Sequence, residues 1–130
     1  MGKSLDALDS TFRPQVDDFL GQCDAAGILL TVIDTDRTET EQRQKLADGV
    51  SWTQHSLHLP QPPEGKSKAI DVCPTVYLPI KGWNPAGELW QRLGAIGEQC
   101  GMFWGGRWTN HPDLGHFQYQ SATKSEGSTT

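Results

Sequence analysis

The chain has 130 residues, of which 35% are hydrophobic and 21% are charged, a composition that is typical of one soluble globular domain. A formal net charge of −5 without a run of basic residues argues against nucleic-acid binding, because phosphate recognition depends on clustered Lys and Arg. The longest apolar stretch, residues 27–32, is too short to cross a bilayer, so membrane insertion is not expected.

The first predicted elements are a helix and a strand. Apolar residues recur at helical spacing over residues 14–26, Pro14 suits a first helical turn, and Gly27 is a typical end of a helix. The β-branched apolar run 28–33 that follows predicts a buried strand.

A second helix is predicted from its capping residues. Thr38 and Glu41 have the spacing of a capping box, which starts a short helix that runs to about Asp48 and ends at Gly49. The segment 50–68 is rich in Pro and Gly and is predicted to be loop for most of its length.

The C-terminal half predicts three strands and one more helix. Residues 69–73 form a short apolar strand, and residues 102–104 and 116–119 are further candidate strands. Asn84 and the following Pro predict the N-cap and first position of a helix with one apolar face. These elements predict a small single α+β domain over residues 1–120, with helices packed against a short antiparallel sheet. The polar tail 121–130 is predicted to be disordered.

The four histidines fall in two short segments, and each segment has a carboxylate near it. His55 and His58 precede Asp71, while a second pair, His111 and His116, flanks Asp113. Imidazole and carboxylate are suitable ligands for Zn²⁺, and a catalytic zinc needs three protein ligands and one open position. On composition alone, either histidine of each pair could be the ligand. The three cysteines are widely spaced and lack a CxxC pair, so we expect reduced thiols and no thiolate zinc site.

The three segments that carry these residues resemble the D-Ala-D-Ala carboxypeptidase/VanY-type zinc metallopeptidases. That family has the pattern S-x-H, then G-x-A-x-D, and later an acid three residues before a final His. This sequence reads SLH at 56–58, SKAID at 67–71 and DLGHF at 113–117. It departs from the pattern in having Ser67 where Gly is usual and an apparent insertion over residues 60–66.

The resemblance implies a role for each matching residue. His58, Asp71 and His116 correspond to the zinc ligands, and Asp113 corresponds to the general base that takes a proton from a zinc-activated water. Glu64 in the inserted loop is the alternative candidate for the base.

Two further stretches agree with the same family. Arg37-Thr38 with Glu41-Gln42 resembles the R-S-x-x-E-Q segment, whose arginine contacts substrate. The stretch WGGRW at 104–108 resembles the phage L-alanyl-D-glutamate endopeptidases in particular, and its two tryptophans are candidates for walls of the cleft.

The resemblance implies an endolysin-like zinc peptidase that cleaves the L-Ala–D-Glu bond in the stem peptide of bacterial peptidoglycan. A D-Ala-D-Ala carboxypeptidase or dipeptidase is the alternative enzyme, and a non-catalytic zinc-stabilised or wall-binding module is the alternative class. We expect a monomer. The N-terminal residues do not have the apolar core of a secretory signal, so we expect synthesis in the cytoplasm and access to the wall by another route.

Overall fold

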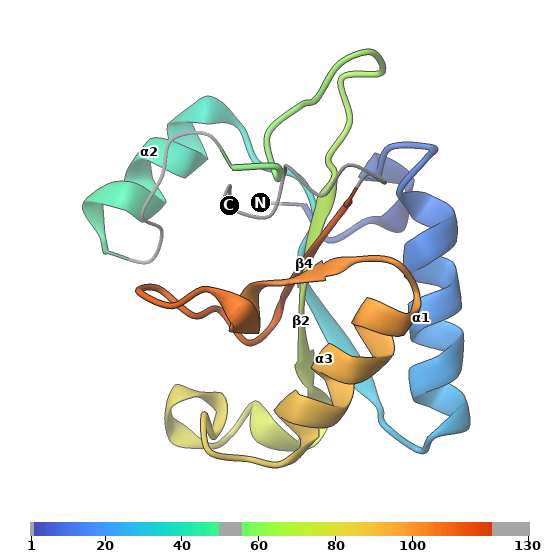
Figure 1. The fold of residues 1–130 in the computed structure, drawn as a ribbon. Coiled ribbons are helices and arrows are strands. Elements are labelled where there is room, and N and C mark those ends of the chain that lie inside the picture. The colour runs from blue at the N-terminus through green and yellow to red at the C-terminus, as the bar shows by residue number, and fades with distance from the viewer. Residues whose placement is uncertain (1, 50–55, 121–130) are drawn as a thin grey trace.

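The computed structural model describes residues 2–49 and 56–120, and these residues form a small α+β fold (Figure 1). His55 and the tail 121–130 lie outside the described residues. The helices are α1 (Arg13–Ala25), α2 (Glu39–Ala47) and α3 (Leu89–Gln99), and the strands are β1 (Leu30–Asp34), β2 (Ala69–Pro74), β3 (Phe103–Trp104) and β4 (His116–Gln118). Short 3₁₀ turns occupy Leu5–Ala7, Thr75–Tyr77, Lys81–Trp83 and Gly105–Arg107. The predicted α+β class is confirmed.

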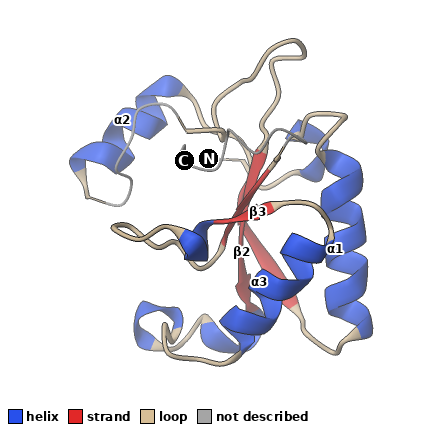
Figure 2. Ribbon diagram, in the orientation of Figure 1, coloured by secondary structure: helices blue, strands red, loops and turns tan. Residues whose placement is uncertain are grey.

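The four strands form one antiparallel sheet in the order β1-β2-β4-β3 (Figure 2). Asp71 on β2 lies opposite Asp34 on β1 and opposite His116 on β4. The register of the central strands therefore places an Asp and a His that are far apart in sequence on neighbouring positions.

Helices α1 and α3 pack side by side against the sheet, whereas α2 lies apart from them (Figure 1). The Phe19 ring of α1 and the Phe117 ring of β4 have centroids 4.7 Å apart in the core. A Cβ on Gly97 of α3 would lie 2.4 Å from the Phe117 ring, so this close approach of helix to strand needs glycine.

Two sequence predictions about these elements need correction. The strand predicted over 28–33 is β1, but it is an edge strand and most of its residues are half-buried, because it has only one neighbour in the sheet. The helix predicted from Asn84 begins at Leu89 instead. Asn84 has a left-handed backbone (φ 55°), which ends the 3₁₀ turn before it, and the backbone N–H of Leu89 donates to the Tyr77 hydroxyl at 3.1 Å.

The capping box of α2 is present as predicted. Glu41 N–H donates to Thr38 Oγ1 at 3.1 Å, and Thr38 N–H donates to Glu41 Oε1 at 2.9 Å. After α2, the described part of the predicted loop, 56–68, contains no helix and only isolated β-bridges. Among the described residues, no helix is long and apolar enough to span a membrane.

Candidate metal centre and cleft

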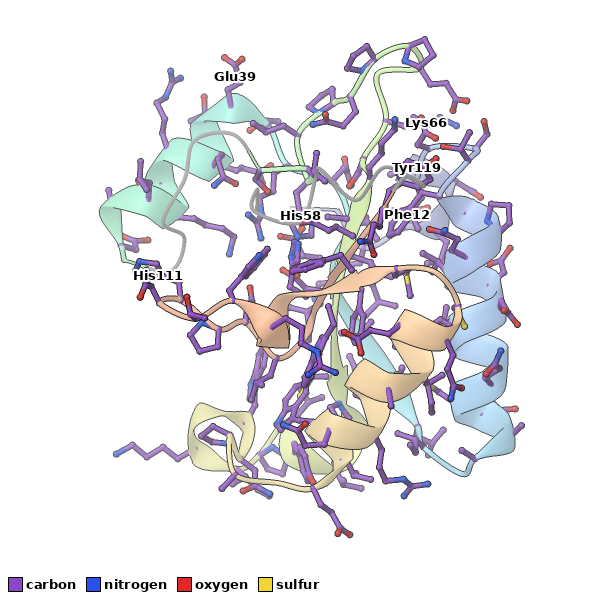
Figure 3. All side chains as sticks on the ribbon, in the orientation of Figure 1. Phe12, Glu39, His58, Lys66, His111 and Tyr119 are labelled. Carbon is purple, nitrogen blue, oxygen red and sulfur yellow. The ribbon has the colours of Figure 1, made fainter. Side chains whose placement is uncertain are left out.

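Three side chains from separate parts of the chain converge on one point. His58 comes from the loop after α2, Asp71 from β2 and His116 from β4, and their potential ligand atoms lie within 4.8 Å of one another. Asp71 Oδ1 is 3.1 Å from His58 Nε2 and 2.9 Å from His116 Nδ1. Figure 3 labels His58 at the centre of the molecule, between α2 and the sheet. Both imidazoles are almost completely buried, and Asp71 remains 17% exposed.

In each imidazole, the ring nitrogen that points away from Asp71 faces a protein oxygen, and this oxygen can only accept a hydrogen bond. His58 Nδ1 lies 2.7 Å from the backbone oxygen of Thr35, and His116 Nε2 lies 2.8 Å from Gln118 Oε1. In the neutral imidazole, each acceptor favours the tautomer with its proton on the nitrogen that faces away from Asp71, and the nitrogen that faces Asp71 can then bind a metal ion.

The centre therefore favours a positive charge between His58, Asp71 and His116. One nitrogen of each imidazole and a carboxylate oxygen converge, and the buried His58 Nε2 has no hydrogen-bond partner among residues 2–49 and 56–120. Burial disfavours charge on His116, but its hydrogen bond to Asp71 and the charges of Asp71 and Asp113 outweigh this and raise the pKa of His116. Burial likewise opposes the charge of Asp71, yet the two histidines hold the pKa of that carboxyl well below its usual value. A divalent cation fits such a donor set.

Arg37 anchors the second oxygen of Asp71. Its Nη2 lies 3.2 Å from Asp71 Oδ2, while its Nε donates to Asp34 Oδ2 at 2.6 Å and its Nη1 donates to Gln42 Oε1 at 2.7 Å. The Arg37 side chain is only 8% exposed, and three of its five N–H bonds contact described residues. Arg37 thus orients the candidate ligand Asp71, and its two other N–H bonds have no partner within residues 2–49 and 56–120.

A cleft of about 470 Å³ opens over Asp71, and Arg37 and Asp113 also line it. One edge of Asp113 is exposed to solvent. Enclosure by the surrounding protein and the negative charge of Asp71 raise the pKa of Asp113, although the histidines and Arg37 oppose this. A carboxylate beside a candidate metal site, within one cleft, is the arrangement that general-base chemistry needs.

The loop that carries Asp113 is held by close backbone contacts. Asp113 N–H donates to the Gly105 carbonyl at 2.9 Å, and a Cβ on Gly105 would lie 2.7 Å from the Asp113 carbonyl oxygen. The Trp108 ring packs on His116 with centroids 5.0 Å apart, and the Trp104 indole donates to the Leu114 carbonyl at 2.8 Å. The stretch 104–108 therefore holds Asp113, Leu114 and His116 in position through these contacts.

Gly115 sits between β4 and β2, and we expect it to be intolerant of any side chain. A Cβ there would lie 2.3 Å from the Val72 carbonyl oxygen, which is backbone and cannot rotate away. Gly115→Ala is expected to destabilise the fold by about 1–3 kcal/mol in urea denaturation, because the strands must separate next to His116. Gly21→Ala is the matched control: it lies in α1 with open space around its Cβ position, and it should stabilise by about 0.5–1 kcal/mol. Equal stability of the two variants would contradict this account.

Several residues considered from the sequence lie elsewhere. Glu64 accepts hydrogen bonds from the backbone N–H and the hydroxyl of Ser10, so the inserted loop 60–66 is attached to the segment before α1. Trp104 is 2% exposed and belongs to the core, so its prediction as a wall of the cleft is wrong. His111 is exposed at the rim of the cleft.

Other site residues were missed by sequence reasoning. Gln118 could have been found, because residues two apart on a strand share a face and His116 precedes it by two. The acceptor for His58 is the backbone oxygen of Thr35, which has no sequence signal. Lys45 of α2 and Trp83 also line the cleft, and only the tertiary structure brings them there.

Comparison with known proteins found a family model and a solved structure that are similar to this chain. Residues 65–119, which carry Asp71, Asp113 and His116, match a family model described as D-alanyl-D-alanine carboxypeptidase. The fold is similar to the crystal structure of the L-Ala D-Glu endopeptidase ChiX of Serratia marcescens, with a TM-score of 0.63 and 22% sequence identity over 89% of this chain and 83% of that chain. No curated protein sequence gave a match.

These findings confirm the resemblance to the D-Ala-D-Ala carboxypeptidase/VanY-type peptidases. The chain also shares the fold of an L-Ala–D-Glu endopeptidase.

Proposed function

We propose that the protein is a zinc-dependent peptidoglycan peptidase that hydrolyses the L-Ala–D-Glu bond of the stem peptide, with His58, Asp71 and His116 as metal ligands. The observation that carries the proposal is that His58 Nε2, His116 Nδ1 and Asp71 Oδ1 lie within 4.8 Å of one another, and that the buried His58 Nε2 has no hydrogen-bond partner among the described residues. Among the described residues, three potential protein ligands meet there, and a catalytic zinc has three protein ligands where a closed structural zinc has four.

The chain's own residues supply the proton chemistry. A bound zinc would lower the pKa of a water molecule and polarise the scissile carbonyl. Asp113 would take a proton from the attacking water as the new C–O bond forms, and would pass a proton to the leaving nitrogen as the C–N bond breaks. Arg37 would hold Asp71 in place, and its two remaining N–H bonds would serve the oxygen that gains negative charge.

The endopeptidase specificity is supported by two features. The fold is shared with an L-Ala–D-Glu endopeptidase, and the stretch 104–108 resembles that of the phage enzymes. The same features support a lytic role as an endolysin. The second candidate is a D-Ala-D-Ala carboxypeptidase, because this is the description of the family model that matches residues 65–119.

The products of peptidoglycan digestion distinguish these two activities. We expect the zinc-loaded protein to release fragments with a new D-Glu amino terminus from purified muropeptides, as identified by mass spectrometry. The protein treated with a chelator should release none, and added zinc should restore cleavage. Accumulation of free D-alanine with intact L-Ala–D-Glu bonds would assign the carboxypeptidase activity instead.

A further inference from the structure

Helix α2 places one lysine at the cleft that contains Asp71 and Asp113. Lys45 is half-buried and lines this cleft together with Gly49, one helical turn further on. Gln42, one turn before Lys45, points inward and binds Arg37. The face of α2 that carries Lys45 is therefore the face turned toward the candidate metal centre.

No described residue neutralises the charge of Lys45. Among residues 2–49 and 56–120, no ion pair or hydrogen bond of its ammonium group is found, although Asp71 and Asp113 line the same cleft. Arg37, the other cation of this cleft, is already bound to two carboxylates and an amide. Lys45 is thus a cation of this cleft that has no partner among the described residues and can pair with a charged ligand.

Another part of the cleft, in the segment that lies apart from α2 in Figure 1, is apolar. Gly82, Trp83 and Pro85 line it, and the Trp83 side chain is 38% exposed. Residues 82–84 all have left-handed backbones, with φ of 62°, 58° and 55°, a conformation that is rare for a bulky residue such as Trp. The buried Trp90 indole lies 3.1 Å from the Trp83 carbonyl oxygen and 3.0 Å from that of Asn84, which stabilises the turn.

We propose that Lys45 binds the substrate carboxylate that is attached to the same carbon as the scissile nitrogen, and that Lys45 thereby determines specificity. This inference rests on the proposed peptidase function. In the L-Ala–D-Glu bond, that group is the α-carboxylate of D-Glu, which lies directly beside the bond that breaks. The cleft then has a cationic end for D-Glu and an apolar end, at Trp83, for the L-Ala side.

The test compares two substrates that differ only in this charge. One is a stem peptide with the free D-Glu α-carboxylate, and the other carries the α-carboxamide, D-isoglutamine. We expect the wild-type protein to prefer the carboxylate in kcat/KM, and Lys45→Met to raise KM for the carboxylate by about tenfold. The same variant should change KM for the carboxamide less than about twofold, and Lys45→Arg should keep the preference.

The matched control is Arg43→Met. Arg43 lies two residues from Lys45, about 200° around the helix, and lines a different pocket beside residues 56 and 59–61. It should retain the substrate preference. Equal losses on both substrates in Lys45→Met, or a wild-type protein that does not distinguish them, would overturn the role of Lys45.

The role of Lys45 can be tested even if the proposed L-Ala–D-Glu cleavage is wrong. If neither stem peptide is cut at L-Ala–D-Glu, the same pair of measurements is made with D-Ala-D-Ala and its C-terminal amide. In D-Ala-D-Ala, the terminal carboxylate is also attached to the carbon that carries the scissile nitrogen. Binding of all four peptides to Asp113→Asn protein provides a readout that does not need hydrolysis. Tighter binding of the carboxylates that disappears with Lys45→Met supports the inference, and binding without such a preference refutes it.

Discussion

Replacement of His116 by Ala is expected to remove bound zinc and abolish peptidase activity. The imidazole Nδ1 lies 2.9 Å from Asp71 Oδ1, and it is one of the three potential ligand atoms that the described part of the chain brings together. Loss of one of three ligands should lower metal affinity by more than about 100-fold, since removal of a supporting partner alone costs about 10–100-fold. Metal analysis after gel filtration measures the zinc content for each chain.

Two companion variants separate ligation from general damage to the cleft. Gln118→Ala removes the acceptor of His116 Nε2 but no ligand, and it should weaken zinc binding by about 10–100-fold. His111→Ala, at the exposed rim of the cleft, should keep full zinc content. One zinc for each chain in folded His116→Ala would refute the proposed ligand set.

Asp113→Asn is expected to keep zinc and lose activity by a factor of about 100 or more. Asparagine preserves the size of the side chain, and the loop is positioned by the backbone bond between Asp113 N–H and the Gly105 carbonyl, which this substitution leaves in place. The amide, however, cannot take a proton from water. Steady-state kinetics on muropeptides and metal analysis of the same preparation provide the two readouts.

The control for the base is Glu64→Gln in the inserted loop. Because the Glu64 carboxylate is bound to Ser10 near the start of α1, this variant should retain peptidase activity. Full activity in Asp113→Asn with loss in Glu64→Gln would move the role of base to the inserted loop.

Much of the candidate site could be predicted, because local patterns and a specific motif carry it. The capping box of Thr38 and Glu41 involves contacts between near neighbours, so α2 was predicted with nearly its observed bounds. His58, Asp71 and His116 were chosen from four histidines only through the resemblance, since composition left both members of each pair open. The structure brings the chosen three together, while their role as ligands stays a prediction.

The start of α3 shows why other elements were not predictable. Asn84 and Pro85 have the pattern of a helix start, but Asn84 adopts a left-handed turn and its carbonyl lies 3.0 Å from the Trp90 indole nitrogen. The first N–H of α3 binds the hydroxyl of Tyr77 instead of a neighbouring side chain. A contact between residues 12 apart overrode a local preference of about 1 kcal/mol.

The sequence by itself determined the kinds of elements, the α+β class and the residue types of the metal motif, since these follow from hydrophobic periodicity, capping and motif spacing. The tertiary structure alone decided that β1 is an edge strand, that Thr35 and Gln118 orient the two imidazoles, and that Lys45 reaches the cleft of Asp71. The physical reason is that sheet order, backbone acceptors and cleft walls arise from contacts between distant segments, and no local pattern encodes such contacts.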